Sequence, residues 1–208
     1  MHFFSSKFKI GILGGGQLGK MLLFDAKRYD LHTKVMDPND KSPCSNIADE
    51  FIVGNLKDYN DVISFGKLVD IITIEIENVN TDALEYLEKI GKKVYPPSRA
   101  VKIIQNKCEQ KEFYKSNNLP TSSFINYSRL SDLKEDLKKG NIKFPFVWKS
   151  AKFGYDGKGV KIIRNHHDLK SINDSLCLIE EKISIKKEIS VIVSRNVDGK
   201  MKCFPVVE

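Results

Sequence analysis

The sequence predicts an α/β chain, with a Rossmann-like N-terminal domain and a second α/β unit after it. An apolar strand at residues 9–13 runs directly into a glycine-rich turn and a helix, which is how a doubly wound domain begins. The pair Pro96-Pro97 then interrupts the chain and marks the best domain boundary. Beyond it, apolar segments at residues 144–148 and 160–163 flank a loop rich in glycine and lysine, which predicts a β-hairpin.

The first domain is expected to alternate strands and helices as far as residue 97. We predict strands at 33–38, 47–53 and 69–78, and helices at 20–28, 59–68 and 81–89, with residues 93–97 closing the domain. Within the third of these strands, Thr73, Glu75 and Glu77 would share one face. Carboxylates at the carboxyl end of a parallel strand lie where open α/β sheets bind ligands. A charged strand end that meets solvent has the same pattern.

The turn after the first strand matches a dinucleotide-binding fingerprint. Gly14, Gly16 and Gly19 fit the G-x-G-x-x-G spacing, and Asp37 ends the next predicted strand. Taken alone, these residues make an NAD-dependent dehydrogenase that uses Gly14–Gly19 one candidate. Asp37 is followed by Pro38, however, and could simply begin a turn. The remaining sequence offers no recognisable hydride-transfer site.

The second unit is predicted to open with one long helix, capped by Ser98 and running to about residue 116. The elements expected after it are a strand at 123–127, a helix at 131–139, the hairpin, a helix at 168–175 and a strand at 189–193.

The hairpin loop combines glycines with lysines. Gly154, Gly157 and Gly159 let the backbone approach a ligand closely, and their N–H groups can point at one anion. Lys149 and Lys158 add positive charge on flexible stems. The loop is therefore suited to cover a polyphosphate. The alternative is a glycine-rich hairpin whose lysines serve only solubility.

Composition bears on partners and location. Lysine supplies most of the formal net charge of +7, but it mostly alternates with acidic residues, as in 134–139, so we expect no nucleic-acid partner. No apolar run approaches the roughly 20 residues that span a bilayer, so no membrane partner is expected either. The first seven residues lack the apolar core of a secretion signal. Four widely spaced cysteines predict neither a zinc site nor a disulfide framework, so a cytoplasmic location is expected.

The sequence of the hairpin loop also resembles that of a known protein family. Gly154-Tyr155-Asp156-Gly157-Lys158-Gly159-Val160, after a strand ending in Lys149, resembles the phosphate loop of the ATP-grasp superfamily. Within it, residues 9–208 resemble the N5-carboxyaminoimidazole ribonucleotide synthetases, which commonly have glycine where Phe153 stands. The resemblance implies a pre-ATP-grasp domain at 1–97 and an ATP-grasp domain at 98–208. The latter would comprise a linker helix, a small subdomain at about 121–183 and the start of the large subdomain at 184–208.

The resemblance implies a set of ATP-binding residues. Lys107 and Lys149 would hold the α- and β-phosphates, residues 180–183 would form the adenine hinge, and Glu188 would bind the ribose hydroxyls. Tyr155, Asp156 and Lys158 would close over the γ-phosphate and are the catalytic candidates. The whole set is Lys107, Lys149, Gly154, Tyr155, Asp156, Gly157, Lys158, Gly159, Val160, Glu180, Glu181, Lys182, Ile183 and Glu188.

The ligand that the resemblance implies for the first domain differs from the dinucleotide that the G-x-G-x-x-G spacing indicates. In this family the N-terminal domain binds no dinucleotide, and its turn helps to hold 5-aminoimidazole ribonucleotide. The residues in the matching positions are Gly16, Gln17, Leu18, Glu75 and Glu77. Gln17 favours the carboxylating branch, because the formate-using relative typically has glutamate there.

The implied reaction is the ATP-dependent carboxylation of 5-aminoimidazole ribonucleotide with bicarbonate, in purine biosynthesis. Mg²⁺ would assist it, with ligands expected beyond residue 208, so we expect no metal ligand in this chain and a truncated, inactive form of the enzyme. The full-length family implies a homodimer. A non-catalytic nucleotide-binding remnant is the other alternative.

Overall fold

The computed structural model describes residues 8–152, 154 and 159–208. Its helices and strands are β1 (Lys9–Leu13), α1 (Gln17–Arg28), β2 (His32–Asp37), β3 (Glu50–Val53), α2 (Tyr59–Lys67), β4 (Ile71–Ile74), α3 (Thr81–Lys89), β5 (Lys93–Tyr95), α4 (Ser98–Ile104), α5 (Lys107–Ser116), β6 (Phe124–Tyr127), α6 (Leu130–Lys139), β7 (Phe146–Ser150), β8 (Val160–Ile163), the 3₁₀ helix η1 (Asp168–Ser171), β9 (Cys177–Glu181), β10 (Val193–Arg195) and β11 (Met201–Cys203).

The first domain is a doubly wound sheet, as predicted. Among the described residues its strands lie in the order β3-β2-β1-β4-β5, and all neighbouring pairs are parallel. Adjacent residues of β1 face opposite layers: Ile12 packs with Leu23 of α1, whereas Leu13 packs with Phe65 of α2 and Leu84 of α3. Apolar residues therefore cover both faces of the sheet, which is why its strands read as nearly continuous hydrophobic runs.

Strand β4 is shorter than the predicted strand 69–78. It ends at Ile74, and Glu75, Ile76 and Glu77 lie in a bend, so the expectation that Glu75 and Glu77 share a strand face is wrong. The neighbouring strand β5 pairs only as far as Thr73, and Pro96 behind it has no N–H with which to extend the ladder.

The second domain is a four-stranded antiparallel sheet in the order β6-β9-β7-β8. Its buried face carries Trp148, Ile163 and Ile179, which pack against Leu133 of α6 and Leu169 of η1. The helix expected at 168–175 is only the short η1. The other face is covered in part by α5, where Cys108 packs on Leu178. The predicted hairpin is confirmed as the pair β7 and β8.

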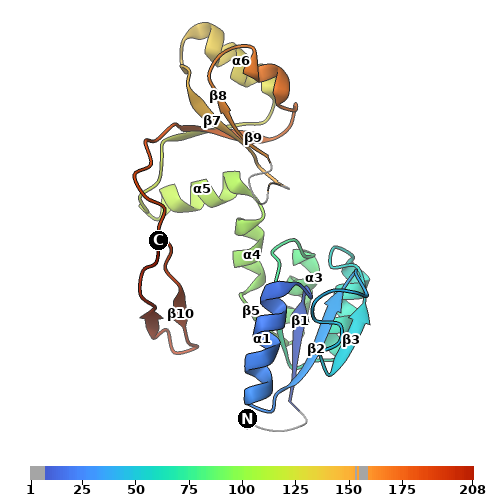
Figure 1. Cartoon of the computed structure of the whole chain (residues 1–208). Coiled ribbons are helices and arrows are strands. Elements are labelled where there is room, and N and C mark those ends of the chain that lie inside the picture. The colour runs from blue at the N-terminus through green and yellow to red at the C-terminus, as the bar shows by residue number, and fades with distance from the viewer. Residues whose placement is uncertain (1–7, 153, 155–158) are drawn as a thin grey trace.

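The linker between the domains differs from the single predicted helix. It consists of α4 and α5, which change direction at Gln105-Asn106 (Figure 1). Asn106 has extended backbone angles, and its side chain accepts a hydrogen bond from the Cys108 N–H, so it ends one helix and caps the next. Ser98 is not the cap of α4. Pro97 occupies that position, and Ser98 instead donates to Glu88.

Residues 181–208 lie apart from both cores. Each of them is exposed, and β10 and β11 form a two-stranded antiparallel ribbon at one side of the molecule (Figure 1). Within the described residues, no helix combines the length and the apolar character that crossing a membrane requires.

Candidate functional site

The glycine-rich turn of the first domain lies at the topological switch point of its sheet. Gly14–Gly16 follow β1, and the Glu75–Glu77 bend follows the adjacent β4. The Glu75 side chain covers the turn, because a Cβ added at Gly16 would lie 2.4 Å from its Oε1 atom. Two groups of predicted substrate-binding residues are thus brought into contact.

Asp37 serves the turn itself. One carboxylate oxygen accepts a hydrogen bond from the Gly15 N–H at 2.7 Å, and the other accepts from the Asn39 N–H at 2.8 Å. A dinucleotide-binding domain uses an acid in this position to bind ribose hydroxyls. Here both oxygens are already engaged with backbone, which favours the interpretation of Asp37 as a turn residue.

Gln17 and Leu18 form the first turn of α1 and are exposed at the same edge of the sheet. The helix has no side-chain cap at Gly16, so its first N–H groups stay open to a ligand. The Glu75 side chain lies against Gly16 and Gly19, the glycines on either side of this pair.

Lys149, Val160 and Glu180 lie on one face of the second sheet. Lys149 pairs with Val160 across the hairpin, and Val147 pairs with Glu180 on the other side of β7. Because partners in register share a face, the half-exposed apolar Val160 and the charged Lys149 and Glu180 point the same way. An apolar surface beside a cation suits a base and a phosphate.

The Glu180 carboxylate is buried between two lysines. Lys149 Nζ lies 2.9 Å from both of its oxygens, Lys111 Nζ lies 3.2 Å from Oε1, and Ser122 Oγ donates to Oε2 at 2.9 Å. Burial alone would raise the pKa of Glu180, but the hydrogen bonds from Lys149, Ser122 and Lys111 outweigh it and lower this pKa. Glu180 is therefore an anion that holds Lys149 in place.

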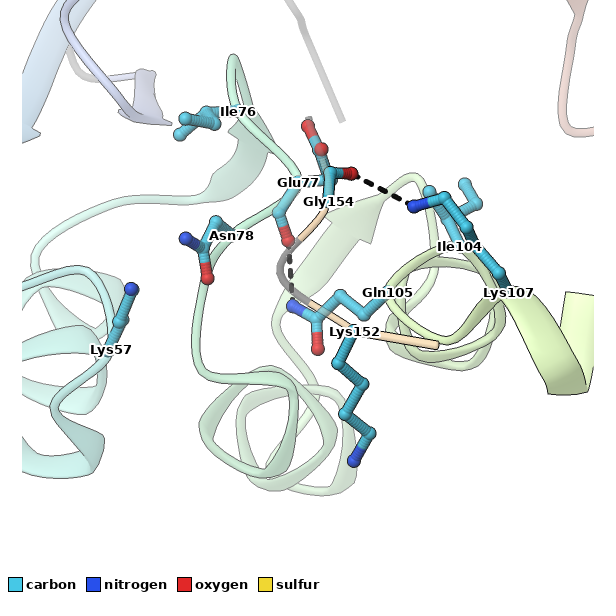
Figure 2. A pocket seen from close by; sticks show the side chains of 9 residues that line it. All are labelled: Lys57, Ile76, Glu77, Asn78, Ile104, Gln105, Lys107, Lys152 and Gly154. Atoms are coloured by element: carbon cyan, nitrogen blue, oxygen red, sulfur yellow. Dashed lines mark hydrogen bonds between the residues drawn. The ribbon is translucent and has the colours of Figure 1, made fainter. Parts of the chain in front are cut away.

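Lys107 connects the linker to the glycine-rich loop. Its N–H donates to the Ala151 carbonyl at 2.8 Å, and its Nζ donates to the Gly154 carbonyl at 2.9 Å (Figure 2). The lysine thus lies at the loop, where the resemblance predicted a phosphate contact.

A cavity of about 510 Å³ separates the two domains at this point. Glu77 lines it from the first domain, and Lys107 and Gly154 line it from the second (Figure 2). Its remaining walls come from Lys57, Ile76, Asn78, Ile104, Gln105 and Lys152. Three lysines and one carboxylate make the cavity predominantly basic, which suits an anionic ligand.

Other predicted residues lie elsewhere or outside the described part. Gly159 has a positive φ of +75°, and a Cβ there would lie 3.2 Å from the Gly154 Cα, so glycine is required where the loop returns. Glu181 ends β9 and accepts from Ser123, while Lys182, Ile183 and Glu188 are exposed on the segment after it. Tyr155, Asp156, Gly157 and Lys158 lie outside the described residues.

Sequence reasoning missed Lys111 and Gln105. Lys111 reads as one more lysine on an amphipathic helix, yet it is buried against Glu180, 69 residues further along the chain. Gln105 donates hydrogen bonds to carbonyl groups of the first domain. A prediction that the Glu180 carboxylate is buried would have been the one signal in the sequence, because a buried carboxylate requires a partner such as Lys111.

The described residues contain no group of three His, Cys, Asp or Glu side chains that could hold a metal ion.

Comparison with known proteins agrees with this architecture. Residues 7–105 match the family model of the ribonucleotide synthetase pre-ATP-grasp domain, and residues 112–208 match that of the ATP-grasp domain. The chain thus combines a pre-ATP-grasp domain with residues of an ATP-grasp domain.

Several of the similar proteins are N5-carboxyaminoimidazole ribonucleotide synthetases. The chain is 34% identical over 215 residues to N5-carboxyaminoimidazole ribonucleotide synthase of Staphylococcus aureus (strain COL), covering 100% of this chain and 56% of the relative. The crystal structure of the synthetase from Thermotoga maritima has a TM-score of 0.85 and 37% identity, covering 96% of this chain and 52% of that one. The Aspergillus clavatus synthase in complex with ADP and 5-aminoimidazole ribonucleotide has a TM-score of 0.85 and 29% identity, covering 97% and 54%. The chain thus spans about half the length of these relatives.

Proposed function

We propose that this chain carries the nucleotide side and part of the acceptor side of an N5-carboxyaminoimidazole ribonucleotide synthetase. One observation carries the proposal: a single basic cavity is lined by Glu77 from the predicted acceptor side and by Lys107 and Gly154 from the predicted nucleotide side. The Aspergillus clavatus relative, whose structure includes ADP and 5-aminoimidazole ribonucleotide, supports the choice of ligands.

The proposed reaction joins bicarbonate to the ribonucleotide in two steps. A bicarbonate oxygen attacks the γ-phosphorus of ATP, which releases ADP and gives carboxyphosphate. The exocyclic amine of 5-aminoimidazole ribonucleotide then attacks the carboxyl carbon, releases phosphate and loses a proton, which gives the N5-carboxy product. Catalysis of phosphoryl transfer depends mainly on positioning and on neutralising charge.

The residues of this chain would bind and position the reactants. Lys149 and Lys107 would hold the α- and β-phosphates, and Lys149 would exchange its contact with Glu180 for one with ATP. Tyr155, Asp156 and Lys158 would close over the γ-phosphate and exclude water. Glu181, Lys182 and Ile183 would border the adenine, and Glu188 would bind the ribose.

Magnesium, bicarbonate, a homodimer and a cytoplasmic location belong to this proposal for the full-length enzyme. The described residues contain no metal-ligating group of three, and the resemblance to the full-length family implies that the Mg²⁺ ligands would lie beyond residue 208. All four cysteines are free, which fits a reducing compartment.

The test is a calorimetric titration of ADP into the parent chain and Lys149→Ala. Loss of a charge-assisted phosphate contact costs roughly 1.5–3 kcal/mol, so we expect affinity to fall about tenfold or more. Lys138→Ala on exposed α6 is the matched control and should bind as the parent does. Equal affinity of Lys149→Ala and the parent would rule out the phosphate contact.

A second titration, with NADH, separates the proposal from the dehydrogenase. We expect no saturable binding, whereas micromolar binding displaced by NAD would overturn the synthetase assignment. Release of ADP in the presence of bicarbonate and the ribonucleotide distinguishes an enzyme from a nucleotide-binding remnant. For residues 1–208 alone we expect no such turnover.

A further inference from the structure

Gln105 lies where the two domains meet. It follows α4 and precedes Asn106, the cap of α5, so it stands at the change of direction between the two linker helices (Figure 1). It also lines the cavity between the domains (Figure 2).

The Gln105 side chain bonds the first domain with both of its amide hydrogens. Its Nε2 atom donates to the Glu77 carbonyl and to the Val79 carbonyl, each at 2.7 Å. An amide NH₂ has two donors, so its hydrogen-bonding capacity as a donor is fully used. Both carbonyls belong to the segment after β4, which carries the acceptor-side carboxylates Glu75 and Glu77.

The residues just after Gln105 bond the opposite wall of the cavity. Lys107 donates from its backbone to Ala151 and from its side chain to Gly154. Asn106 between them is buried and held by Cys108 and Glu109 through hydrogen bonds of 3.1 and 2.8 Å. The consecutive residues Gln105, Asn106 and Lys107 therefore connect the acceptor wall of the cavity to its nucleotide wall. Because Asn106 is buried and hydrogen-bonded, the backbone between the two walls has little conformational freedom.

We propose that Gln105 is a positioning residue that fixes the acceptor segment relative to the glycine-rich loop and so couples binding of the two ligands. The inference rests on the proposed function for the identity of those ligands. The two hydrogen bonds keep the Glu75–Glu77 bend at a constant distance from Lys107. A ligand bound at one wall of the cavity therefore helps to position the residues of the other wall. This effect is a coupling free energy between the two binding sites.

The chemistry of the amide gives a matched set of variants. Gln105→Glu keeps the shape of the side chain but replaces both donors by acceptors, which would face two carbonyl oxygens. Gln105→Lys restores a group that can donate to both carbonyls. Gln110→Glu makes the same chemical change five residues further on, at a side chain without this role, and serves as the control.

The first measurement is the distance between spin labels on the two domains. Labels are attached through Lys89→Cys on α3 and Lys138→Cys on α6, in a Cys203→Ser background, because the other three cysteines are buried. We expect a narrow distance distribution for the parent, Gln110→Glu and Gln105→Lys, and a broadened one for Gln105→Glu. An unchanged distribution in Gln105→Glu would overturn the inference.

The second measurement is ligand coupling, which a merely stabilising residue would not alter. ADP is titrated with and without saturating 5-aminoimidazole ribonucleotide. Couplings between sites are typically about fivefold or more, and we expect Gln105→Glu to abolish the effect while Gln105→Lys retains it. Retained coupling in Gln105→Glu contradicts the inference. If the parent binds neither ligand, the proposed function fails, and the label distances still decide the role of Gln105.

Discussion

At the scale of single residues, the buried charge of the Glu180 carboxylate is stabilised by its ion-pair and hydrogen-bond partners. It is buried and receives contacts from Lys149, Lys111 and Ser122. Lys149 is the partner that would leave when ATP binds. Lys111 is itself buried and also donates to Thr121 and Ser122. It would therefore remain as the counter-ion that keeps Glu180 compensated in both states.

Lys111→Met should strongly destabilise the fold. Removing one partner of a buried ion pair leaves an uncompensated charge, typically at a cost of about 3–5 kcal/mol, and Lys149 reduces this here to about 2–4 kcal/mol. Urea unfolding of the parent and the variant measures the loss.

Glu180→Leu and the double variant complete the cycle. If the pair is coupled, Lys111→Met combined with Glu180→Leu costs less than the sum of the single changes. Strictly additive losses would show that the two residues contribute independently.

Asp49 gives the molecule an acid-sensitive contact. Burial raises the pKa of Asp49, but hydrogen bonds from Lys27 and Thr33 dominate and lower it to about 2. A carboxyl with a lower pKa in the folded state adds stability at pH above its unfolded value of about 3.9. That stability is lost as the pH falls from about 4 towards 2.

Asp49→Asn should therefore cost about 1–2 kcal/mol at pH 7, after allowance for the partial exposure of the group. The gap between parent and variant should narrow as the pH approaches 2. Urea unfolding across this range checks it, with the exposed Asp40→Asn as the control. A gap that stays constant with pH would contradict the assignment of the shift to Asp49.

At the scale of elements, the packing of α2 on α3 depends on Gly66. A Cβ added at Gly66 would lie 2.4 Å from Leu87 Cδ1 and 3.1 Å from Ile72 Cδ1, and both side chains are fully buried. Glycine here permits the two helices to approach each other.

Gly66→Ala should destabilise the first domain although alanine is the better helix former. Propensity offers about 1 kcal/mol in favour, but overpacking a filled core costs typically about 1–3 kcal/mol. Thermal unfolding of Gly66→Ala is compared with Ser64→Ala, an exposed position in the same helix that should be neutral or slightly stabilising. A raised melting temperature for Gly66→Ala would show that α3 can shift.

Local patterns predicted the elements that depend on them. Apolar runs and glycine positions sufficed for β1, β2 and β3 of the first sheet, although not for the end of β4, and for the β7–β8 hairpin with Lys149 at its end. The break at Gln105-Asn106 was not predicted, because one helical pattern continues through it and the Asn106 cap is a local competitor for the backbone. The contacts of Gln105 with Glu77 and of Lys111 with Glu180 join residues that are far apart in the sequence. No local pattern specifies which distant acceptor such a side-chain donor will bond.

At the scale of the whole molecule, burial is unevenly distributed. Two packed domains contain the hydrophobic clusters, whereas residues 181–208 are exposed and include Ile185, Val197 and Phe204. A two-stranded ribbon without a covered face is marginally stable.

Amide hydrogens of β10 and β11 should therefore exchange much faster than those of β7 and β9. Local opening costs little where few apolar contacts are broken. Hydrogen exchange followed by mass spectrometry tests this within one sample, because β7 and β9 serve as the internal reference. Comparable protection of the ribbon would mean that another surface covers it in solution.

The place of Trp148 has a spectroscopic consequence. It is the single tryptophan of the chain and lies in the core of the second domain, directly before Lys149. Light absorbed at the red edge of the protein spectrum excites this ring alone, so its emission reports the melting of that domain, whereas circular dichroism reports both. Coincident curves would mean that the linker makes the two domains one cooperative unit. Separated curves would give the stability of each domain from a single heating experiment, without cutting the chain.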